Sequence, residues 1–437
     1  NVVAINGVNT SSAVVVTDNA GTAGTFNNIT IQNNDIRRAY IGVFTNATVT
    51  AGNGANLLIT QNDLDTSGAN AIRTVGVYVQ GADGATVSSN SIGNFDGGTD
   101  EDDTGIWLAS GTTNSTVERN TVKNLNYTGT GGYGAHGIKI SSAVTNANDV
   151  VKNNFIYGLS GDGYDYTSAS FYADNVFGIF ATGGTQTGVK IYNNSVYLSG
   201  NTLDQTNAIS AGIAIDSGSS VEVINNAVAN DLGRLAGTGY GSVGIWLRSG
   251  TAILSAANNN NYYVNPTGSG TKAVGQISAT ASTTITDWQT ATGQEGNSIS
   301  ANPLFVSSTD LHLQLVSGLV GLGTPIGSVT VDYDNDPRPA SAPDIGADEI
   351  VQSVGGVMPS GTFYNASYYL GDTLSGDVSV TNTLYLLGVT NGAGYTTTVG
   401  CNATVVGGSS FTYIDGAVRK DFCTTGAFDF PVGQNQY

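Results

Sequence analysis

The sequence has little charge, and positive charge is especially scarce. Only 11% of its 437 residues are charged, and 14 Lys and Arg stand against 33 Asp and Glu, which gives a formal net charge of −19. Nucleic-acid binding depends on a basic surface, so the composition argues against it, and it disfavours anionic polysaccharides for the same reason. A surface with so few charges must be covered by Ser, Thr and Asn, and we therefore expect an extracellular protein.

Long apolar runs are missing as well, and cysteine is rare. No run of 18 apolar residues occurs, so the sequence predicts no membrane span in this chain. The start carries no basic segment followed by an apolar one, as a signal peptide would, and we expect a mature or excised piece of a protein. In an oxidising compartment the only two cysteines, Cys401 and Cys423, predict a disulfide, with two free thiols as the alternative.

The sequence does contain a repeat. A phrase of the form apolar-x-x-Asn-x-apolar occurs seven times, at intervals of 28 to 40 residues. Its asparagines are Asn34, Asn62, Asn90, Asn120, Asn154, Asn194 and Asn226. A second phrase, Gly-apolar-x-apolar, alternates with it from Gly76 to Gly244. Such a period indicates stacked units, and the alternation of apolar and polar residues within each phrase is the two-residue period of β-strands. The sequence predicts an all-β solenoid, a parallel β-helix.

The asparagine has a physical role in such a fold. Stacked coils bring equal positions above one another at the spacing of strands, roughly 4.8 Å. An Asn side chain donates and accepts at once, and Asn reaches the left-handed backbone region more readily than other residues except glycine. We therefore expect the seven asparagines to form an internal hydrogen-bonded ladder.

The composition changes after about residue 300, where prolines gather. Four motifs follow in order: Asn302-Pro303-Leu304-Phe305, Asp310-Leu311-His312-Leu313, Asp334-x-Asp336-x-Arg338-Pro339 and Asp344-Ile345-Gly346-Ala347-Asp348-Glu349. Together they resemble the closing segment of secreted bacterial right-handed parallel β-helix proteins, whose architecture is similar to that of pectate lyases. The resemblance implies that residues 1–300 are the coils of a right-handed β-helix and that residues 301–351 close it.

The remaining residues predict a small C-terminal β module. Residues 352–360 have the composition of a linker, and residues 361–437 are rich in Thr and Gly with alternating apolar positions. The stretches 413–420 and 430–433 resemble a module of large Bacteroidota surface proteins exported by type IX secretion. In such proteins the sequence continues, so the resemblance implies a truncated module and a location at the cell surface.

One column of side chains is a candidate contact surface. In each glycine phrase the middle residue should point outward, because successive side chains of a strand alternate between faces. This column consists of Phe44, Tyr78, Trp107, Lys139, Phe180, Ala214 and Trp246. We expect its aromatic members to contact a glycan, another copy of the chain or another surface protein. The alternative is that the long loops between coils fold over this face and bury it.

Catalysis is the rival interpretation, because β-helix lyases and hydrolases resemble the predicted architecture. Lyases need a basic residue beside a neutralised carboxylate, and hydrolases need paired carboxylates. The basic candidates are scattered singly along the sequence; they are Lys139, Lys152, Lys190 and Arg248. The sequence therefore indicates no catalytic residue. It favours a structural or adhesive surface protein, with a polysaccharide lyase or glycoside hydrolase as the alternative.

Calcium is the only cofactor that the sequence suggests. Asp332, Asp334 and Asp336 alternate like the start of a calcium loop, although Pro337 at the position of the expected Gly and the lack of a Glu at the right distance exclude an EF-hand. Asp344 or Asp348 would complete a looser site. For the acidic run 100–103 we expect a solvated loop rather than a calcium site. The two histidines, His136 and His312, are expected to be structural.

Overall fold

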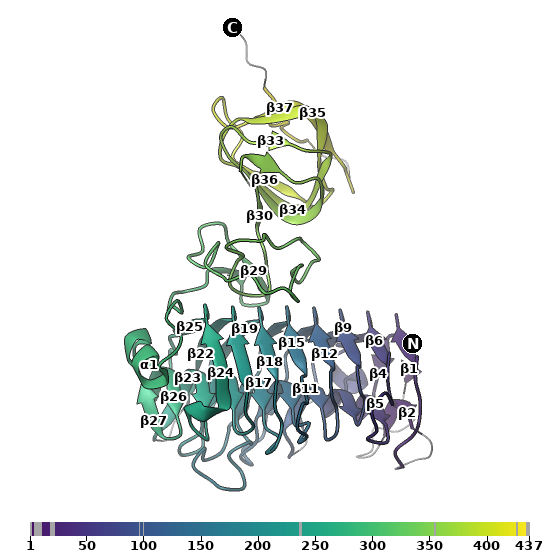
Figure 1. Cartoon of the computed structure of the whole chain (residues 1–437), viewed down its shortest axis with the longest axis vertical. Helices are drawn as coiled ribbons and strands as arrows, with labels where there is room; N and C mark the ends of the chain where they lie inside the picture. Colours follow the sequence, from purple (N-terminus) through teal and green to yellow (C-terminus); the bar gives the residue numbers. More distant parts are fainter. Residues whose placement is uncertain are drawn as a thin grey trace. The chain divides into compact units, whose positions relative to one another are not determined.

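The computed structural model describes residues 2–3, 11–17, 22–95, 97–98, 100–235, 238–353, 355–424 and 427–433. The chain divides into two compact units. The first comprises Asn1–Thr324 and Ile345–Ala347, and the second comprises Pro325–Asp344 and Asp348–Tyr437. Almost all of the regular secondary structure in both units is β-strand (Figure 1).

Three sheets of stacked strands form most of the first unit (Figure 1). The ten-stranded sheet contains β2 (Ser12–Val16), β5 (Ile41–Asn46), β8 (Val75–Gln80), β11 (Asp103–Leu108), β14 (Ala135–Ile140), β17 (Val176–Ala181), β20 (Ser210–Ile215), β23 (Tyr240–Leu247), β26 (Thr271–Ile277) and β27 (Thr280–Ser282). The seven-stranded sheet contains β7 (Asp63–Leu64), β10 (Ser91–Gly93), β13 (Thr121–Lys123), β16 (Phe155–Tyr157), β19 (Ser195–Leu203), β22 (Ala227–Arg234) and β25 (Asn261–Val264). The eight-stranded sheet contains β3 (Thr30–Gln32), β6 (Leu58–Thr60), β9 (Thr86–Ser88), β12 (Thr116–Glu118), β15 (Val150–Lys152), β18 (Lys190–Tyr192), β21 (Val221–Ile224) and β24 (Leu254–Asn258).

The pairing of these strands follows one rule. Each strand lies parallel to the strand three places later in the chain, so the chain visits the three sheets in turn and then returns to the first. The one exception within the three sheets is β27, which pairs antiparallel with β26. A two-stranded parallel pair, β1 (Val2–Val3) with β4 (Ile36–Arg37), precedes them. This topology is compatible with the predicted parallel β-helix, and apolar side chains from all three sheets fill one continuous core.

The repeated asparagines lie in one hydrogen-bonded column, which we call the Asn ladder. Each member donates from its backbone N–H and from its Nδ2 to the Oδ1 of the next member; from Asn90 to Asn120 these distances are 3.0 and 2.9 Å. The Nδ2 also donates to a carbonyl of the preceding coil, such as Ile59 O for Asn90, at 2.9 Å. The ladder runs from Asn34 through Asn62, Asn90, Asn120, Asn154, Asn194 and Asn226 to Asn260.

The ladder ends in acceptors of a different kind. Asn260 donates from its backbone N–H to Ser298 Oγ (2.9 Å) and from Nδ2 to Glu295 Oε2 (3.0 Å). The sequence suggested that the ladder asparagines adopt the left-handed backbone conformation, but the residue before each of them adopts it instead. At each ladder step that residue has a positive φ, as for Arg119 (54°) and Asn153 (53°), so the corner lies one position before the ladder.

The glycine phrase has a steric cause. A Cβ on Gly105 would lie 2.4 Å from Val122 Cγ1 and 2.6 Å from the carbonyl oxygen of Gly137 in the next coil. A side chain at this position would collide with both atoms. Glycine therefore allows the backbone of the ten-stranded sheet to approach the core residues of the opposite sheet.

A helix that the sequence analysis did not predict closes the core at its C-terminal end. Helix α1 (Ile285–Thr292) begins after Thr284, whose Oγ1 accepts a hydrogen bond from Asp287 N, and ends at Gly293 with φ 67°. Its Trp288 is fully buried and lies so close to Gly275 that a Cβ there would be 2.3 Å from the indole. Two short strands follow, β28 (Phe305–Ser307) and β29 (Asp310–Leu313), and pair antiparallel.

The second unit contains a smaller sheet in which all pairs are parallel. Its strands are β30 (Val351–Gln352), β31 (Val357–Met358), β32 (Gly361–Tyr368), β33 (Thr373–Leu374), β34 (Val378–Leu386), β35 (Thr390–Val399), β36 (Thr404–Val406) and β37 (Ile414–Lys420). Gly361 is paired with Val378, Val378 with Thr397, and Thr397 with Val418, so the chain returns to the same place every 17 to 21 residues. Strand β30 ends in the stretch with linker composition, residues 352–360, and β31 lies within it.

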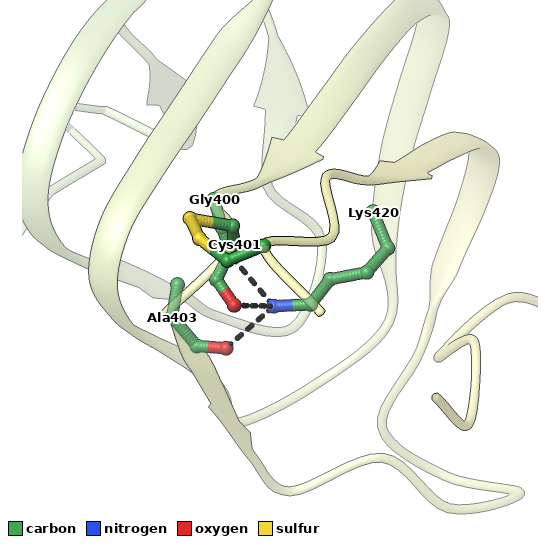
Figure 2. Close-up of a disulfide and its surroundings, with 5 residues drawn as sticks. Gly400, Cys401, Ala403 and Lys420 are labelled. Atoms are coloured by element: carbon green, nitrogen blue, oxygen red, sulfur yellow. Dashed lines mark hydrogen bonds between the residues drawn. A yellow bond between two sulfur atoms is a disulfide. The ribbon is translucent and has the colours of Figure 1, made fainter. Parts of the chain in front are cut away.

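A disulfide joins Cys401 and Cys423 in this unit, with their Cα atoms 5.2 Å apart. Figure 2 shows the Lys420 ammonium beside it, donating to the carbonyl oxygens of Gly400, Cys401 and Ala403. The disulfide and the lysine together hold the turn after β35 to the end of β37.

Replacing one member in the middle of the Asn ladder should destabilise the first unit strongly. Asn120→Ala removes an acceptor for two donors of Asn90 and donors to Asn154, Val87 and Glu118. We expect the free energy of unfolding in urea to fall by about 3 kcal/mol, because buried polar groups lose their partners. Asn297→Ala, at an exposed asparagine outside the ladder, is the matched control and should change it by less than about 0.5 kcal/mol. Equal effects would contradict the role given to the ladder.

A buried acid in the core should make stability depend on pH. Asp149 is fully buried, accepts hydrogen bonds from Ser115 N (3.0 Å) and the Ser142 hydroxyl, and has its pKa raised by burial to about 7. The folded state therefore holds this proton more tightly than the unfolded state, so the stabilisation present at low pH is lost as the pH rises from about 4 to about 7. We expect Asp149→Asn to remove about 2 kcal/mol of the decrease in unfolding free energy between about pH 5 and about pH 8. Equal pH profiles for the variant and the parent protein would rule this out.

Candidate functional site

The outer side of the ten-stranded sheet carries the predicted column, and we call it the aromatic face. Strand pairing places its members in register, one per coil: Phe44, Tyr78, Trp107, Lys139, Phe180, Ala214 and Trp246. The strand register and the Asn ladder hold these side chains directly above one another, at a regular spacing along the stack. The face divides into an open part and a covered part.

Three rings form the open part. Phe44, Tyr78 and Trp107 are all partly exposed. The rings of Phe44 and Tyr78 stack with centroids 5.2 Å apart and planes 11° apart, and Trp107 meets Tyr78 edge to face at 5.2 Å. Both polar ring atoms are engaged: Tyr78 donates to Gln80 Oε1 (2.6 Å) and Trp107 to Ser141 Oγ (2.7 Å). These bonds fix the rings and leave apolar ring surface accessible.

The covered part contains Phe180 and Trp246. Both are buried, with exposed fractions of 0% and 1%, so the expectation that they are exposed is wrong. The cause is the loop 158–175, a long insertion between β16 and β17 whose Tyr166, Tyr172 and Ala173 pack over these rings. The sequence analysis gave burial by a long loop as the alternative to an exposed face. Here such a loop turns half of the face into a second small core.

A polar network holds this loop down. The Arg248 guanidinium lies 3.6 Å from the centre of the Tyr172 ring and donates to Asp216 Oδ1 at 2.8 Å. The Tyr172 hydroxyl donates to the other oxygen of Asp216, also at 2.8 Å. These hydrogen bonds keep the pKa of Asp216 below its usual value, although burial acts in the opposite direction. Arg248 therefore anchors the loop, which is a structural role.

Lys139 lies where the open and covered parts meet, beside two carboxyl groups. Its Nζ is 4.3 Å from the Trp107 ring centre and 5.9 Å from that of Phe180. Asp102 and Asp174 lie within hydrogen-bonding reach of each other, and burial followed by the charge of Asp174 raises the pKa of Asp102 to about 7. Burial also raises the pKa of Asp174, whereas burial lowers that of Lys139 against the pull of both carboxylates.

Sequence reasoning missed this group, because its acids come from two different loops. Asp102 belongs to the acidic run 100–103, whose other members also have partners: Glu101 accepts from the Tyr40 hydroxyl and Asp100 from the Tyr127 hydroxyl at 2.7 Å. Asp174 ends the loop that covers the aromatic face. Neither the spacing nor the periodicity of the sequence indicates that these two segments meet.

The remaining candidates lie apart from the aromatic face or serve the fold. Lys152 forms an ion pair with Glu118 (3.2 Å) on the eight-stranded sheet, which also carries Lys190. His136 is fully buried, and its Nε2 lies 2.9 Å from Ala173 O. Burial, followed by the charge of Lys139, lowers its pKa well below 6.5, so the ring is neutral. His312 packs edge to face against Phe155.

The three aspartates proposed for calcium surround a turn in the second unit. Asp332 Oδ1 accepts from Asp334 N and Asp336 N, both at 2.8 Å, and its Oδ2 accepts from Glu349 N at 2.9 Å. Burial and the nearby charge of Asp348 raise the pKa of Asp332 well above its usual value. The Asp332 carboxylate thus organises the turn through backbone N–H groups, and a calcium ion at these three residues stays a prediction.

Comparison with models of known protein families gives no match to the chain, and comparison with curated proteins gives none. Among the described residues, no helix has the length and apolar character needed to cross a membrane.

The two parts of the aromatic face should respond differently to truncation. Trp246→Ala leaves a cavity beneath the loop 158–175, and we expect the unfolding free energy to fall by about 3–5 kcal/mol. Trp107→Ala, in the same column but partly exposed, is the matched control and should cost less than half as much. Limited proteolysis should cut the loop faster in the Trp246 variant only. A similar loss for both variants would contradict the division into open and covered parts.

Proposed function

We propose that this chain is part of an extracellular bacterial surface protein, a stiff right-handed parallel β-helix that adheres to an uncharged glycan through Phe44, Tyr78 and Trp107. The observation that carries the proposal is the contiguous open part of the aromatic face. The three partly exposed rings come from three successive coils, and the centroids of neighbouring rings are 5.2 Å apart. The Tyr78 hydroxyl and the Trp107 indole N–H already donate hydrogen bonds within the protein.

The chemistry of this surface suits a sugar chain. The apolar face of a sugar ring stacks on aromatic side chains, and contiguous accessible apolar surface marks contact sites. The repeated coils present one ring per coil, which matches a ligand that is itself a linear repeat. A rigid platform also loses little conformational entropy when it binds, and the Asn ladder provides that rigidity.

Charge favours an uncharged glycan over an anionic one. The chain carries a net charge of −19, and Lys139, the cation at the end of the platform, is accompanied by two carboxyl groups. An acidic polysaccharide would meet repulsion along the whole approach. A protein partner, including a second copy of the chain, is the other occupant that an open aromatic surface accommodates, and the test below separates the two.

Cleavage of a polysaccharide is the second candidate, favoured by the position of Lys139 beside the platform. In a lyase, Lys139 would abstract the proton, and its lowered pKa suits a base. Two observations weigh against cleavage. The acidic surroundings disfavour the uronate substrates of such lyases, and Asp102 and Asp174 lie within hydrogen-bonding reach of each other, closer than the roughly 5–9.5 Å that separate hydrolase carboxylates.

A glycan array on the full chain tests the binding proposal. We expect signal on neutral polysaccharides, and a loss of at least about ten-fold in affinity for Tyr78→Ala combined with Trp107→Ala, since each aromatic contact contributes about 1 kcal/mol or more. Tyr395→Ala, at an exposed tyrosine of the second unit, is the control and should bind as the parent protein does.

Two results would contradict the proposal. Glycan binding unaffected by the double substitution would remove the platform from the account, and concentration-dependent self-association lost in the double variant, without any glycan signal, would assign the face to a second copy. Chain shortening in a depolymerisation assay, abolished by Lys139→Met, would establish the second candidate instead.

A further inference from the structure

A pocket lies on a different side of the first unit, over the outer face of the seven-stranded sheet. Its floor is one column of outward side chains, in which strand pairing aligns Tyr197, Ala229 and Tyr263 on three successive coils. The small residue stands between two tyrosines, so a slot opens where the column would otherwise be filled. The two tyrosines are about 10 Å apart along the stack, twice the strand spacing.

The segment that closes the coils forms the opposite wall. Residues 302–305, residues 307–308 and Gln314 line the pocket, and Phe305 meets Tyr197 edge to face with centroids 6.4 Å apart. This wall is fixed by hydrogen bonds: Gln314 Nε2 donates to Phe305 O (3.0 Å) and Gln314 N to Leu304 O (3.0 Å). The volume of this open pocket is about 390 Å³, within the range of small-ligand sites, roughly 300–1,000 Å³.

Asp231 is the only charged residue among those that line this pocket. Its Oδ2 accepts a hydrogen bond from the Tyr197 hydroxyl at 3.2 Å. Its Oδ1 is buried and accepts no hydrogen bond within the described part of the chain, so the acceptor capacity that remains for an occupant lies on Oδ2, where the Tyr197 hydroxyl uses one of two lone pairs. Burial raises the pKa of this carboxyl group, and a partner that donates hydrogen bonds would offset that effect.

These features specify the chemistry of an occupant. Three aromatic rings offer stacking surface, one carboxylate accepts hydrogen bonds, and Asn265, Asn302 and the serines of the wall add polar groups at the rim. Among the described residues that line the pocket there is no Lys, Arg or His, so an anionic group would go uncompensated by them. A small ring with an apolar C–H face, several hydroxyl donors and no negative charge meets all of these conditions.

We propose that this pocket is a second glycan site, which binds a single uncharged pyranose ring between Tyr197 and Tyr263 with Asp231 accepting its hydroxyl hydrogen bonds. It lies on a different sheet from the aromatic face and does not depend on the function proposed there.

Saturation-transfer NMR on the full chain measures the binding of four probes: D-glucose, D-galactose, D-mannose and N-acetyl-D-glucosamine. At least one should bind. Ala229→Leu fills the slot between the two tyrosines, and Asp231→Asn removes the charge without changing the shape of the side chain. Each substitution should weaken binding at least about ten-fold. For Asp231→Asn this is the value of one hydrogen bond to a charged group. Ala256→Leu, an outward position on the eight-stranded sheet, is the matched control and should bind as the parent protein does.

Two comparisons keep the outcome decisive. D-galacturonate should bind more weakly than D-galactose if the pocket is the site, and Trp107→Ala should leave the signal unchanged. The proposal is overturned if none of the four sugars binds the parent protein, or if binding survives both Ala229→Leu and Asp231→Asn. A signal lost in Trp107→Ala but kept in the pocket variants would assign the sugar to the aromatic face and would also overturn it.

Discussion

Each asparagine of the ladder donates two hydrogen bonds toward the next coil and accepts two from the coil before it, and this one-way pattern sets the register of the whole stack. A coil displaced by one residue would bury an amide and a carbonyl group without partners, at a cost of about 1–3 kcal/mol for each group. The pattern also demands an acceptor at its C-terminal end, which Ser298 and Glu295 supply. The ladder therefore aligns the coils, and its last donors are satisfied by residues from the segment that follows them.

The surfaces of the first unit follow from that register. Because equal positions lie above one another, a single residue type repeated along the chain becomes a continuous column: apolar side chains inside, glycines at the close approach and aromatic rings outside. Insertions between coils leave the columns intact and act only on the surface. The loop 158–175 covers half of the aromatic face, and the closing segment turns a gap at Ala229 into a pocket.

Within the coils, the sequence predicts the features that recur with the repeat and misses most of those that occur once. The strands, their parallel stacking and the ladder positions are visible because the asparagine keeps a fixed offset to two apolar residues in every coil. The burial of Phe180 and Trp246 and the meeting of Asp102 with Asp174 depend on loops that occur once, and no periodic signal reveals where such loops fold. Helix α1 carried its capping residues, Thr284 and Gly293, in the sequence, but eight residues among many strands give a weak helical pattern.

The central claim is that the side-chain amides of the ladder are bonded from coil to coil within a closed core. Hydrogen exchange of these amides, followed by NMR on protein labelled with ¹⁵N at asparagine, tests it most directly. The account predicts that the Nδ2 protons of Asn90, Asn120 and Asn154 exchange as slowly as the backbone amides of the central strands, whereas those of exposed Asn297 exchange at the rate of a free side chain. Rapid exchange at all three ladder positions would contradict it.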